Sequence, residues 1–558
     1  MFKNCLLVAL AAALVTPVLA QEKLDLEMLT RIRQEGFHHS QVMKTASELD
    51  DRIGPRLTAS PNMARANEWT RDQLAQWGLA NAHLESWGTY DRGWQQQAVS
   101  LRMLSPDITN FIAYPKPWTP STPGAVRAKA IKVKIEKKED LDQYKGKLAG
   151  MIVLLGDMRE VKMREKPLAE RYDEKGLAEE FEYKIPDEKP RFDKDAYRKR
   201  MEFTEALQKF LIDEKALAVI EPSRAGDGGT VFVQAARNFP WKASQSLGVP
   251  SVVVAIENYG RMARLLDRNV DVELEMNVEN KSFDNVTNND TIAEIPGADP
   301  KLKDEVVMLG AHLDSWAGGT GATDNGSGSA VVMEAMRILK ALDVKPRRTI
   351  RVALWSGEEQ GLLGSEGYVR NHFAGFQTPT DPEEAKLPHW LRSRELAVIT
   401  KPEHAKLAAY FNDDNGSGAF RGIYTQENAA VRPIFESWIE PLKDLGMTTV
   451  SERNTGGTDH ESFDDVGLPG FQFIQDELEY DSRTHHSNMD VYERLQRDDL
   501  MQGSVVMAWF VYNAAMRDQM LPRKPLPHPE LDEQRKAPLK NVMPGATAAA
   551  EETKKPGE

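Results

Sequence analysis

The mature chain that this sequence predicts lacks cysteine. The single cysteine among the 558 residues is Cys5, and it falls within an N-terminal segment that we expect to be removed. A chain without cysteine forms no disulfide bonds and offers no thiolate to a metal ion. Any metal site must therefore be built from histidine, aspartate and glutamate, a donor set that suits a hard or borderline ion such as zinc.

Long apolar runs are missing after the first twenty residues. Lys3 precedes an apolar run from Cys5 to Val18, and small residues up to Ala20 precede Gln21. This order is typical of a signal peptide with its cleavage site, and an uncleaved anchor is the alternative. No later segment reaches the roughly 18 apolar residues that a membrane span needs. We expect a signal peptide at 1–20, export to the periplasm or the medium, and no membrane span in the mature chain.

An excess of positive charge is also missing. The chain has 85 acidic and 71 basic residues, which gives a formal net charge of −14. Such a balance argues against a nucleic-acid partner, because phosphates would be repelled. The length predicts two or more domains. The sequence leaves the oligomeric state open, with a homodimer among the alternatives.

Strand-like and helical segments alternate through most of the chain. Residues 24 to about 80 have apolar positions at helical spacing. Strand-like runs are predicted within 146–157, 215–223 and 248–266, and later in VVMLGA, TIRVALW, LAAYFN and GFQFIQ. This alternation predicts an α/β fold with a mostly parallel, mixed sheet flanked by helices. In such sheets ligands bind beyond the carboxyl ends of the strands.

Two segments differ in composition from the rest. Residues from about 158 to 210 are dense in charges of alternating sign. We interpret them as a solvated helical insertion supported by i,i+4 charge pairs, in preference to a binding element. Residues 522–558 are rich in Pro, Lys, Glu and Ala, and are predicted to form a disordered tail.

Histidines and acidic residues follow four of the predicted strands. They lie in HLD after VVMLGA, in SGEEQG after TIRVALW, in NDDNGSG after LAAYFN and in THHSNMD after GFQFIQ, and ATDNGSG precedes a predicted helix. Each motif has an ordinary structural explanation, such as a helix N-cap for Asp324 or an Asx-turn for DDNGSG. Together they predict one metal site at a sheet edge. The adjacent Glu358 and Glu359 support it, because carboxylates at the end of a buried strand are costly without a cation.

These motifs resemble the cocatalytic zinc exopeptidases, which include secreted bacterial aminopeptidases, and are most similar to the carboxypeptidase Q branch. The resemblance covers about residues 305–495. The segment between about 125 and 275 looks like an inserted protease-associated domain. We therefore expect a discontinuous zinc peptidase domain at 21–120 and 279–521. A β-rich protease-associated domain at 121–278 would contain the charged insertion.

The resemblance implies two zinc ions held by five residues. His312 and Asp414 would hold one ion, Glu359 and His486 the other, and Asp324 would bridge the two. Asp413 competes with Asp414 for its role, and His485 competes with His486.

The resemblance also implies catalytic and substrate-binding roles. Asp314 would hydrogen-bond the far nitrogen of His312 and fix its tautomer, and Glu358 would be the general base. His485 stands where related enzymes often have a tyrosine that steadies the oxyanion. His460, in GGTDHESF, resembles a segment near the substrate, so both are candidate substrate-binding residues.

The preferred function is hydrolysis of peptides, by removal of an N-terminal residue or by splitting of a dipeptide. A carboxypeptidase is the alternative, and it would need a cation such as Arg421 or Arg453 to bind the substrate carboxylate. A glutaminyl cyclase-like transferase would hold one zinc ion. A receptor-like binding module would hold none.

Overall fold

The computed structural model describes residues 22–185, 193–236, 240–385, 387, 396–531 and 534–536. The predicted signal peptide at 1–20 and most of the predicted tail lie outside the described residues.

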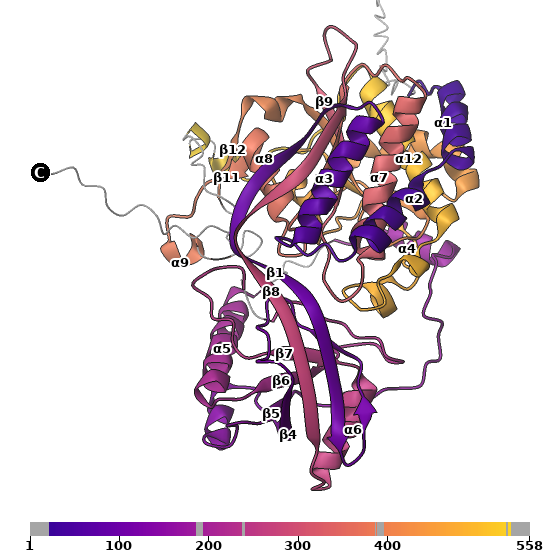
Figure 1. Ribbon diagram of the computed structural model, residues 1–558. Coiled ribbons are helices and arrows are strands. Elements are labelled where there is room, and N and C mark those ends of the chain that lie inside the picture. The colour runs from indigo at the N-terminus through magenta and orange to yellow at the C-terminus, as the bar shows by residue number, and fades with distance from the viewer. Residues whose placement is uncertain are drawn as a thin grey trace, which may run out of the picture.

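Two long antiparallel strands connect the two lobes of the molecule (Figure 1). Strand β1 (Ala80–Ser105) pairs with β8 (Glu273–Ile295) along nearly its whole length. One end of this ribbon joins the sheet of the larger lobe through β10, and the other joins the sheet of the smaller lobe through β4. The lobes therefore share these strands, and the predicted border at residue 278 falls inside β8.

The larger lobe contains a mostly parallel sheet in the order β15-β14-β16-β13-β9-β10-β8. Strands β10, β9, β13 and β16 are parallel neighbours, whereas β8 is antiparallel to β10 and β14 is antiparallel to β16. Strand β15 at the edge is parallel to β14. The newly named strands are β9 (Val306–His312), β10 (Thr349–Trp355), β13 (Leu407–Asn412), β14 (Phe420–Tyr424), β15 (Thr449–Ser451) and β16 (Gly470–Gln475). The predicted α/β class with a mostly parallel sheet flanked by helices is confirmed.

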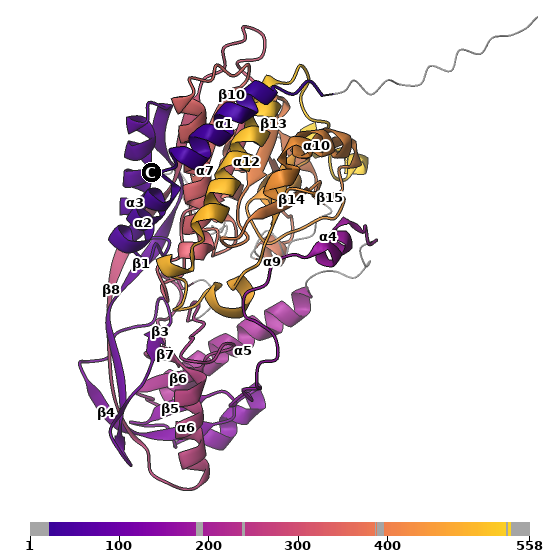
Figure 2. The same cartoon turned by 90° about the vertical axis from the view of Figure 1, so that its right-hand side faces the viewer.

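Helices cover both faces of this sheet (Figures 1 and 2). One face packs against α1 (Leu26–His38), α2 (Val42–Ser47), α3 (Pro61–Gln76), α7 (Ser327–Ala341), α10 (Arg432–Ile439) and α12 (Arg497–Met516). The other face packs against α8 (Leu363–His372) and α11 (His460–Asp464). Helix α12 is apolar over most of its length and buried from Leu500 to Ala515, as expected for a helix enclosed by neighbours.

In the smaller lobe the hydrogen-bonded sheet continues from β8 in the order β4-β5-β6-β7-β3. Its strands are β3 (Ala113–Pro115), β4 (Val126–Val133), β5 (Ile152–Leu155), β6 (Ala218–Pro222) and β7 (Ser251–Val254), and the two-residue β2 (Thr109–Asn110) pairs with β1. Helix α6 (Ile256–Asp267) packs on one face and α5 (Lys194–Asp213) on the other. The strands predicted within 146–157, 215–223 and 248–266 correspond to β5, β6 and β7. A separate two-stranded antiparallel sheet is formed by β11 (Ala374–Phe376) and β12 (Val398–Thr400). The short α9 (Pro382–Ala385) lies between these two strands in the sequence.

The charged insertion is helical only in part, and its described residues before 186 are mostly exposed. Helix α4 (Glu174–Phe181) packs beside β15 of the larger lobe (Figure 2). Just before it, Glu170 forms a β-bridge with Leu478, and Arg171 pairs with Asp476 at 2.8 Å. These contacts with the larger lobe were not predicted, because charge alternation does not reveal ion pairs with residues distant in sequence.

The tail is ordered beyond the predicted start of disorder at residue 522. Lys524 Nζ lies 2.6 Å from Asp464 Oδ1, and Leu526 packs against the core of the larger lobe. A low apolar content therefore does not prevent this short stretch from being held by an ion pair and one apolar anchor.

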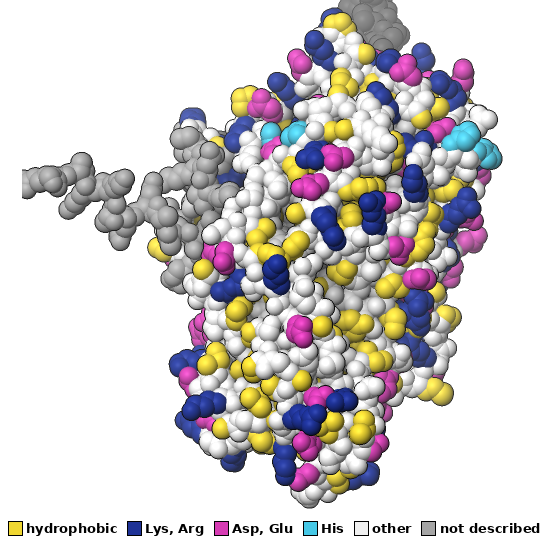
Figure 3. Space-filling view, viewed as in Figure 1, with side chains coloured by type: hydrophobic (Ala, Val, Ile, Leu, Met, Phe, Trp, Pro, Cys, Tyr) yellow, Lys and Arg dark blue, Asp and Glu magenta, His cyan; other side chains and the backbone are white. Residues whose placement is uncertain are grey.

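Among the described residues, no helix is long and apolar enough to cross a membrane. Acidic and basic side chains are interspersed over both lobes on the face in Figure 3.

Candidate metal centre

The predicted ligands meet at the carboxyl ends of the parallel strands. His312 ends β9, where it pairs in register with Trp355 at the end of β10. Glu359 follows β10, Asp414 follows β13, and His486 follows the short helix Tyr480–Thr484 after β16. Because neighbouring parallel strands end at one edge, residues far apart in sequence converge there.

Asp324 lies between the two histidines. Its Oδ1 is 3.2 Å from His312 Nε2, and its Oδ2 is 3.2 Å from His486 Nε2. The residue sits in the turn Ala322–Gly326 that precedes α7 and is 3% exposed. Each of its carboxylate oxygens therefore faces a different imidazole, the arrangement that a bridging ligand requires.

The geometry favours His486 over His485 as the neighbour of Glu359. His486 Nε2 lies 3.0 Å from Glu359 Oε2. His485 Nε2 is 3.9 Å from Asp324 Oδ2, and its other ring nitrogen faces Asp481 at 3.6 Å.

Asp414, and not Asp413, faces His312. Asp414 Oδ1 lies 3.3 Å from His312 Nε2. Asp413 is 1% exposed, and neither of its carboxylate oxygens makes a hydrogen bond within the described part of the chain. The choice between these adjacent aspartates thus depends on how the turn after β13 directs their side chains.

Asp314 contributes in a different way from that predicted. His312 Nδ1 lies 3.0 Å from the backbone carbonyl oxygen of Asp314 and 3.7 Å from its Oδ1. The carbonyl, rather than the carboxylate, therefore accepts from the ring. The carboxylate instead accepts from Thr58 Oγ1 at 2.8 Å and from the backbone N–H of Glu358 at 3.2 Å. Asp314 thus links the loop after β9 to the predicted general base.

Comparison with known proteins agrees with this geometry. Residues 290–510 match the family model of Peptidase family M28. This part of the chain belongs to Peptidase family M28. Carboxypeptidase Q from Mus musculus is 24% identical over 485 residues, which span 85% of this chain and 86% of that protein.

Solved structures show the same fold. A Peptidase M28 precursor from Shewanella amazonensis superimposes with a TM-score of 0.62 at 23% identity, covering 90% of this chain and 98% of that one. A zinc aminopeptidase from Bacillus subtilis gives a TM-score of 0.51 at 19% identity, covering 86% and 95%. The family assignment makes this chain a peptidase.

The donor set of this M28 site suits a metal ion. Two groups of possible ligands share Asp324, and within each group the ligand atoms lie within 4.8 Å of one another. One group is Asp324, His485 and His486, and the other is His312, Asp324 and Asp414. Asp324 Oδ2 and Glu359 Oε1 are buried and make no hydrogen bond within the described part of the chain. Buried carboxylate oxygens without a donor are costly unless a cation is near. Oxygen and imidazole ligands without thiolate are compatible with zinc.

The electrostatics of the M28 site reflect crowded buried charges. Burial raises the pKa of Glu358 well above its usual range, and the charges of Asp414 and Glu359 raise it further against the effect of His312. Burial tends to lower the pKa of His312, but the charges of Asp414 and Glu358 raise it well above the usual histidine value. The excess of acidic over basic groups is what a bound cation would balance.

The two predicted substrate-binding histidines differ in their surroundings. His460 at the start of α11 is fully buried, and its Nε2 lies 3.0 Å from the carbonyl oxygen of Thr455. The side chain of His485 is 35% exposed, and its ring stacks on Tyr480 with 4.5 Å between centroids. His485 therefore lies at the accessible side of the site, whereas His460 lies inside the protein.

Tyr480 and Arg56 were not identified from the sequence as residues of the site. Burial and the charges of Asp324 and Asp414 raise the pKa of Tyr480 well above its usual value, and its ring packs against Gly416. An aromatic residue in a loop gives no sequence signal of such a neighbourhood.

Arg56 is fully buried beneath the loop that follows His312. Its guanidinium donates to the carbonyl oxygens of Leu313, Thr320 and Gly321 at 2.7, 2.8 and 2.7 Å. The Gly-Pro-Arg sequence at 54–56 is the signal that could have pointed to this residue.

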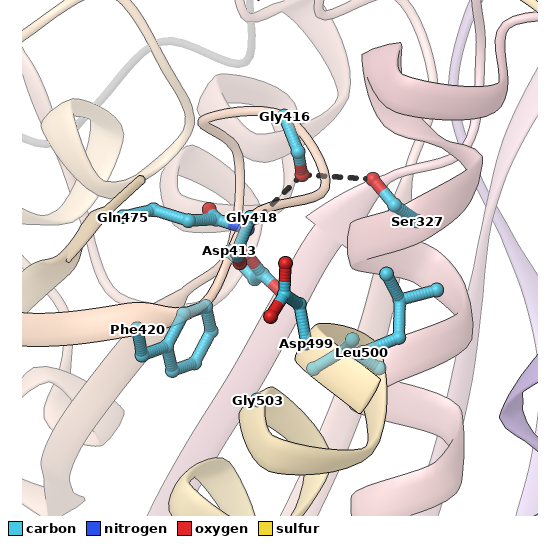
Figure 4. A pocket seen from close by; sticks show the side chains of 10 residues that line it. Ser327, Asp413, Gly416, Gly418, Phe420, Gln475, Asp499, Leu500 and Gly503 are labelled. Atoms are coloured by element: carbon cyan, nitrogen blue, oxygen red, sulfur yellow. Dashed lines mark hydrogen bonds between the residues drawn. The ribbon is translucent and has the colours of Figure 1, made fainter. Parts of the chain in front are cut away.

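A small pocket lies behind the loop that carries Asp414 (Figure 4). Across it, Ser327 Oγ donates to the carbonyl oxygen of Gly416 at 2.9 Å, and Gln475 Nε2 donates to those of Gly416 and Gly418. These bonds hold the Asp414 loop against α7 and β16. The pocket is lined by none of the predicted ligands, so it supports the loop rather than receiving substrate.

Proposed function

We propose that this M28 peptidase is a dinuclear zinc exopeptidase that removes N-terminal residues from peptides or splits dipeptides. The observation that carries the proposal is the position of Asp324, whose two oxygens face His312 and His486 at equal distances of 3.2 Å. One zinc ion would be held by His312, Asp324 and Asp414. The other would be held by Asp324, Glu359 and His486.

The proposed chemistry assigns proton transfer to Glu358. Zinc ions held at this site would polarise the scissile carbonyl and make water acidic enough to attack near neutral pH. Glu358 takes the proton of the attacking water and delivers it to the leaving amine. Its Oε2 lies 4.0 Å from His312 Nε2, and its backbone is fixed by Asp314. Glu358 therefore lies beside the proposed ligand His312.

The first experiment is hydrolysis of a dipeptide panel by purified protein. Each dipeptide is supplied free, N-acetylated and C-amidated, and zinc content is measured alongside. If N-acetylation abolishes cleavage and C-amidation does not, the aminopeptidase polarity holds. Glu358→Gln is expected to lose activity and keep zinc, whereas Glu403→Gln, a change at an exposed residue, should keep both. Activity in Glu358→Gln equal to that of wild type would exclude the proposed general base.

The second candidate is a carboxypeptidase, supported by the match to Carboxypeptidase Q from Mus musculus. That reaction needs a cation for the substrate carboxylate. Arg421 already pairs with the buried Asp476 at 3.1 Å, and Arg453 pairs with Glu180 at 3.0 Å. Both of the arginines considered for this role are thus engaged by the protein, which favours the aminopeptidase. Cleavage lost on amidation rather than acetylation would reverse this choice.

We also propose that the smaller lobe is a protease-associated domain and that the chain is exported. The β-rich sheet inserted between β1 and β8 supports the first proposal. The signal-like segment at 1–20 supports the second. Sequencing of the N-terminus of protein recovered from the periplasm or medium tests export, because cleavage should leave Gln21 first.

A further inference from the structure

The loop that carries His486 is paired with a segment of the smaller lobe. Val233 N–H donates to the carbonyl oxygen of His486 at 2.9 Å, and Asn488 N–H donates to that of Val231 at 3.0 Å. Phe232 and Ser487 form an antiparallel bridge between these bonds. The two segments therefore form a short strand-like contact between the lobes.

The side chain of Asn488 extends this contact. Its Oδ1 accepts from the backbone N–H of Val231 at 2.7 Å, and its Nδ2 donates to the carbonyl oxygen of Gly229 at 3.2 Å. His486 itself has a φ of 66°. A non-glycine residue in this left-handed region persists only where its surroundings fix it. The smaller lobe supplies part of that constraint through Val233.

Gln234 continues the contact to the imidazole ring of His486. The Gln234 side-chain amide lies 2.8 Å from His486 Nδ1, while Nε2 of the same ring faces Asp324 and Glu359. A histidine that binds a metal through Nε2 carries its proton on Nδ1, and this proton needs an acceptor. The amide meets that need when it presents Oε1, since a half-turn about its last bond exchanges its oxygen and nitrogen.

The Nδ1 proton of His312 has its acceptor within the larger lobe. His312 Nδ1 lies 3.0 Å from the carbonyl oxygen of Asp314, two residues away in its own loop. The two histidines of the site thus differ in where their supporting acceptor comes from. One is internal to the larger lobe, and the other is carried by the smaller lobe.

We propose that Gln234 is a positioning residue that accepts from His486 Nδ1 and so makes one of the two zinc sites depend on the smaller lobe. This inference rests on the proposed dinuclear site. It assigns the smaller lobe a part in building the metal centre, beyond any contact with substrate. The zinc site that contains Glu359 and His486 should weaken when the acceptor is removed, and the site that contains His312 should not.

The test compares Gln234→Met, which keeps the length of the side chain without an acceptor, with Gln234→Glu, which keeps an acceptor. Gln208→Met is the matched control, because Gln208 lies on the same lobe and donates to Ala236 rather than to a ligand. Zinc release is followed by titrating the full-length protein with a chelator of known affinity. Loss of a hydrogen-bonded partner of a metal ligand typically costs about 10–100-fold in metal affinity.

We expect Gln234→Met to release one zinc ion at about 10–100-fold lower free chelator and the other as in wild type. Gln234→Glu and Gln208→Met should release both ions as wild type does. Equal release from Gln234→Met and wild type would overturn the proposal. Release of a zinc ion from Gln234→Glu at lower free chelator than from wild type would also overturn it. This second comparison remains decisive if Gln234→Met fails to fold.

The outcome is separable from that of the proposed function. If wild type binds two zinc ions and cleaves none of the dipeptides, the substrate proposal fails while the chelator comparison stands. If wild type cleaves dipeptides and Gln234→Met releases zinc as wild type does, only the positioning role fails.

Discussion

His312 Nε2 and Asp414 Oδ1 lie 3.3 Å apart although 102 positions separate the two residues in the chain. The contact exists because β9 and β13 are parallel neighbours, so that the residues following them emerge at the same edge of the sheet. Asp413, one position earlier, has no comparable contact with His312. The adjacent aspartates thus offer a matched pair of variants.

Asp414→Asn is expected to lose one of the two proposed zinc ions, because it removes an anionic ligand, whereas Asp413→Asn should retain both. The effect on affinity should exceed the roughly 10–100-fold typical of an indirect partner. Zinc per chain is measured by atomic emission after dialysis against a weak chelator. If Asp413→Asn were the variant that lost zinc, the assignment of these residues would have to be exchanged.

Asp324→Asn should weaken both zinc sites at once, because Asp324 faces both histidines. Native mass spectrometry distinguishes this result from that of Asp414→Asn. The first variant should be found mostly without metal and the second mostly with one ion. Retention of one tightly bound ion by Asp324→Asn would show that the carboxylate serves a single site.

Arg56→Met should destabilise the protein strongly. Arg56 pairs with the buried Asp50 at 3.5 Å and donates to carbonyl oxygens of the loop after His312. Removing one partner of a buried ion pair typically costs about 3–5 kcal/mol. Urea unfolding followed by intrinsic fluorescence measures the change.

The control for that change is Arg52→Met, because the side chain of Arg52 is 74% exposed and pairs with Glu48 at the surface. Exposed pairs are worth roughly 0–1 kcal/mol. Similar unfolding midpoints for the two variants would show that Arg56 contributes no more than a surface arginine.

The burial of His404, which lies outside the metal site, predicts that stability depends on pH. Burial lowers the pKa of His404, even though its hydrogen bond to the carbonyl oxygen of Val466 acts in the opposite direction. The unfolded chain therefore takes up a proton at higher pH than the folded one. This contribution to the free energy of unfolding is present at neutral pH and is lost as the pH falls through the ordinary histidine value of about 6.5.

His404→Gln retains an N–H donor for Val466 and removes the titration. The melting temperature of wild type should fall more than that of His404→Gln between about pH 7.5 and about pH 5.5, on either side of that value. His83→Gln, at a residue whose side chain is 40% exposed, should follow wild type. Parallel curves for wild type and His404→Gln would exclude the effect.

The main strands and helices of the larger lobe were predictable because their signals are local. β9, β10, β13 and β16 are short, buried apolar runs, and α7 has apolar residues at helical spacing. The lengths of β1 and β8 were not predicted, since their stability comes from pairing with each other across almost 200 residues of sequence. The docking of Arg171 on Asp476 was missed for the same reason.

The sequence by itself determined which residue types stand at the ends of which strands, and hence the chemistry of the candidate site. The family resemblance had favoured Asp414 over Asp413 and His486 over His485, and only the tertiary structure shows that Asp414 faces His312 and that His486 faces Glu359. It also decided that the carbonyl of Asp314, and the amide of Gln234 from another lobe, lie against the two imidazoles. Residue type follows from the chain alone, whereas the direction of a side chain in a loop is set by packing against segments distant in sequence.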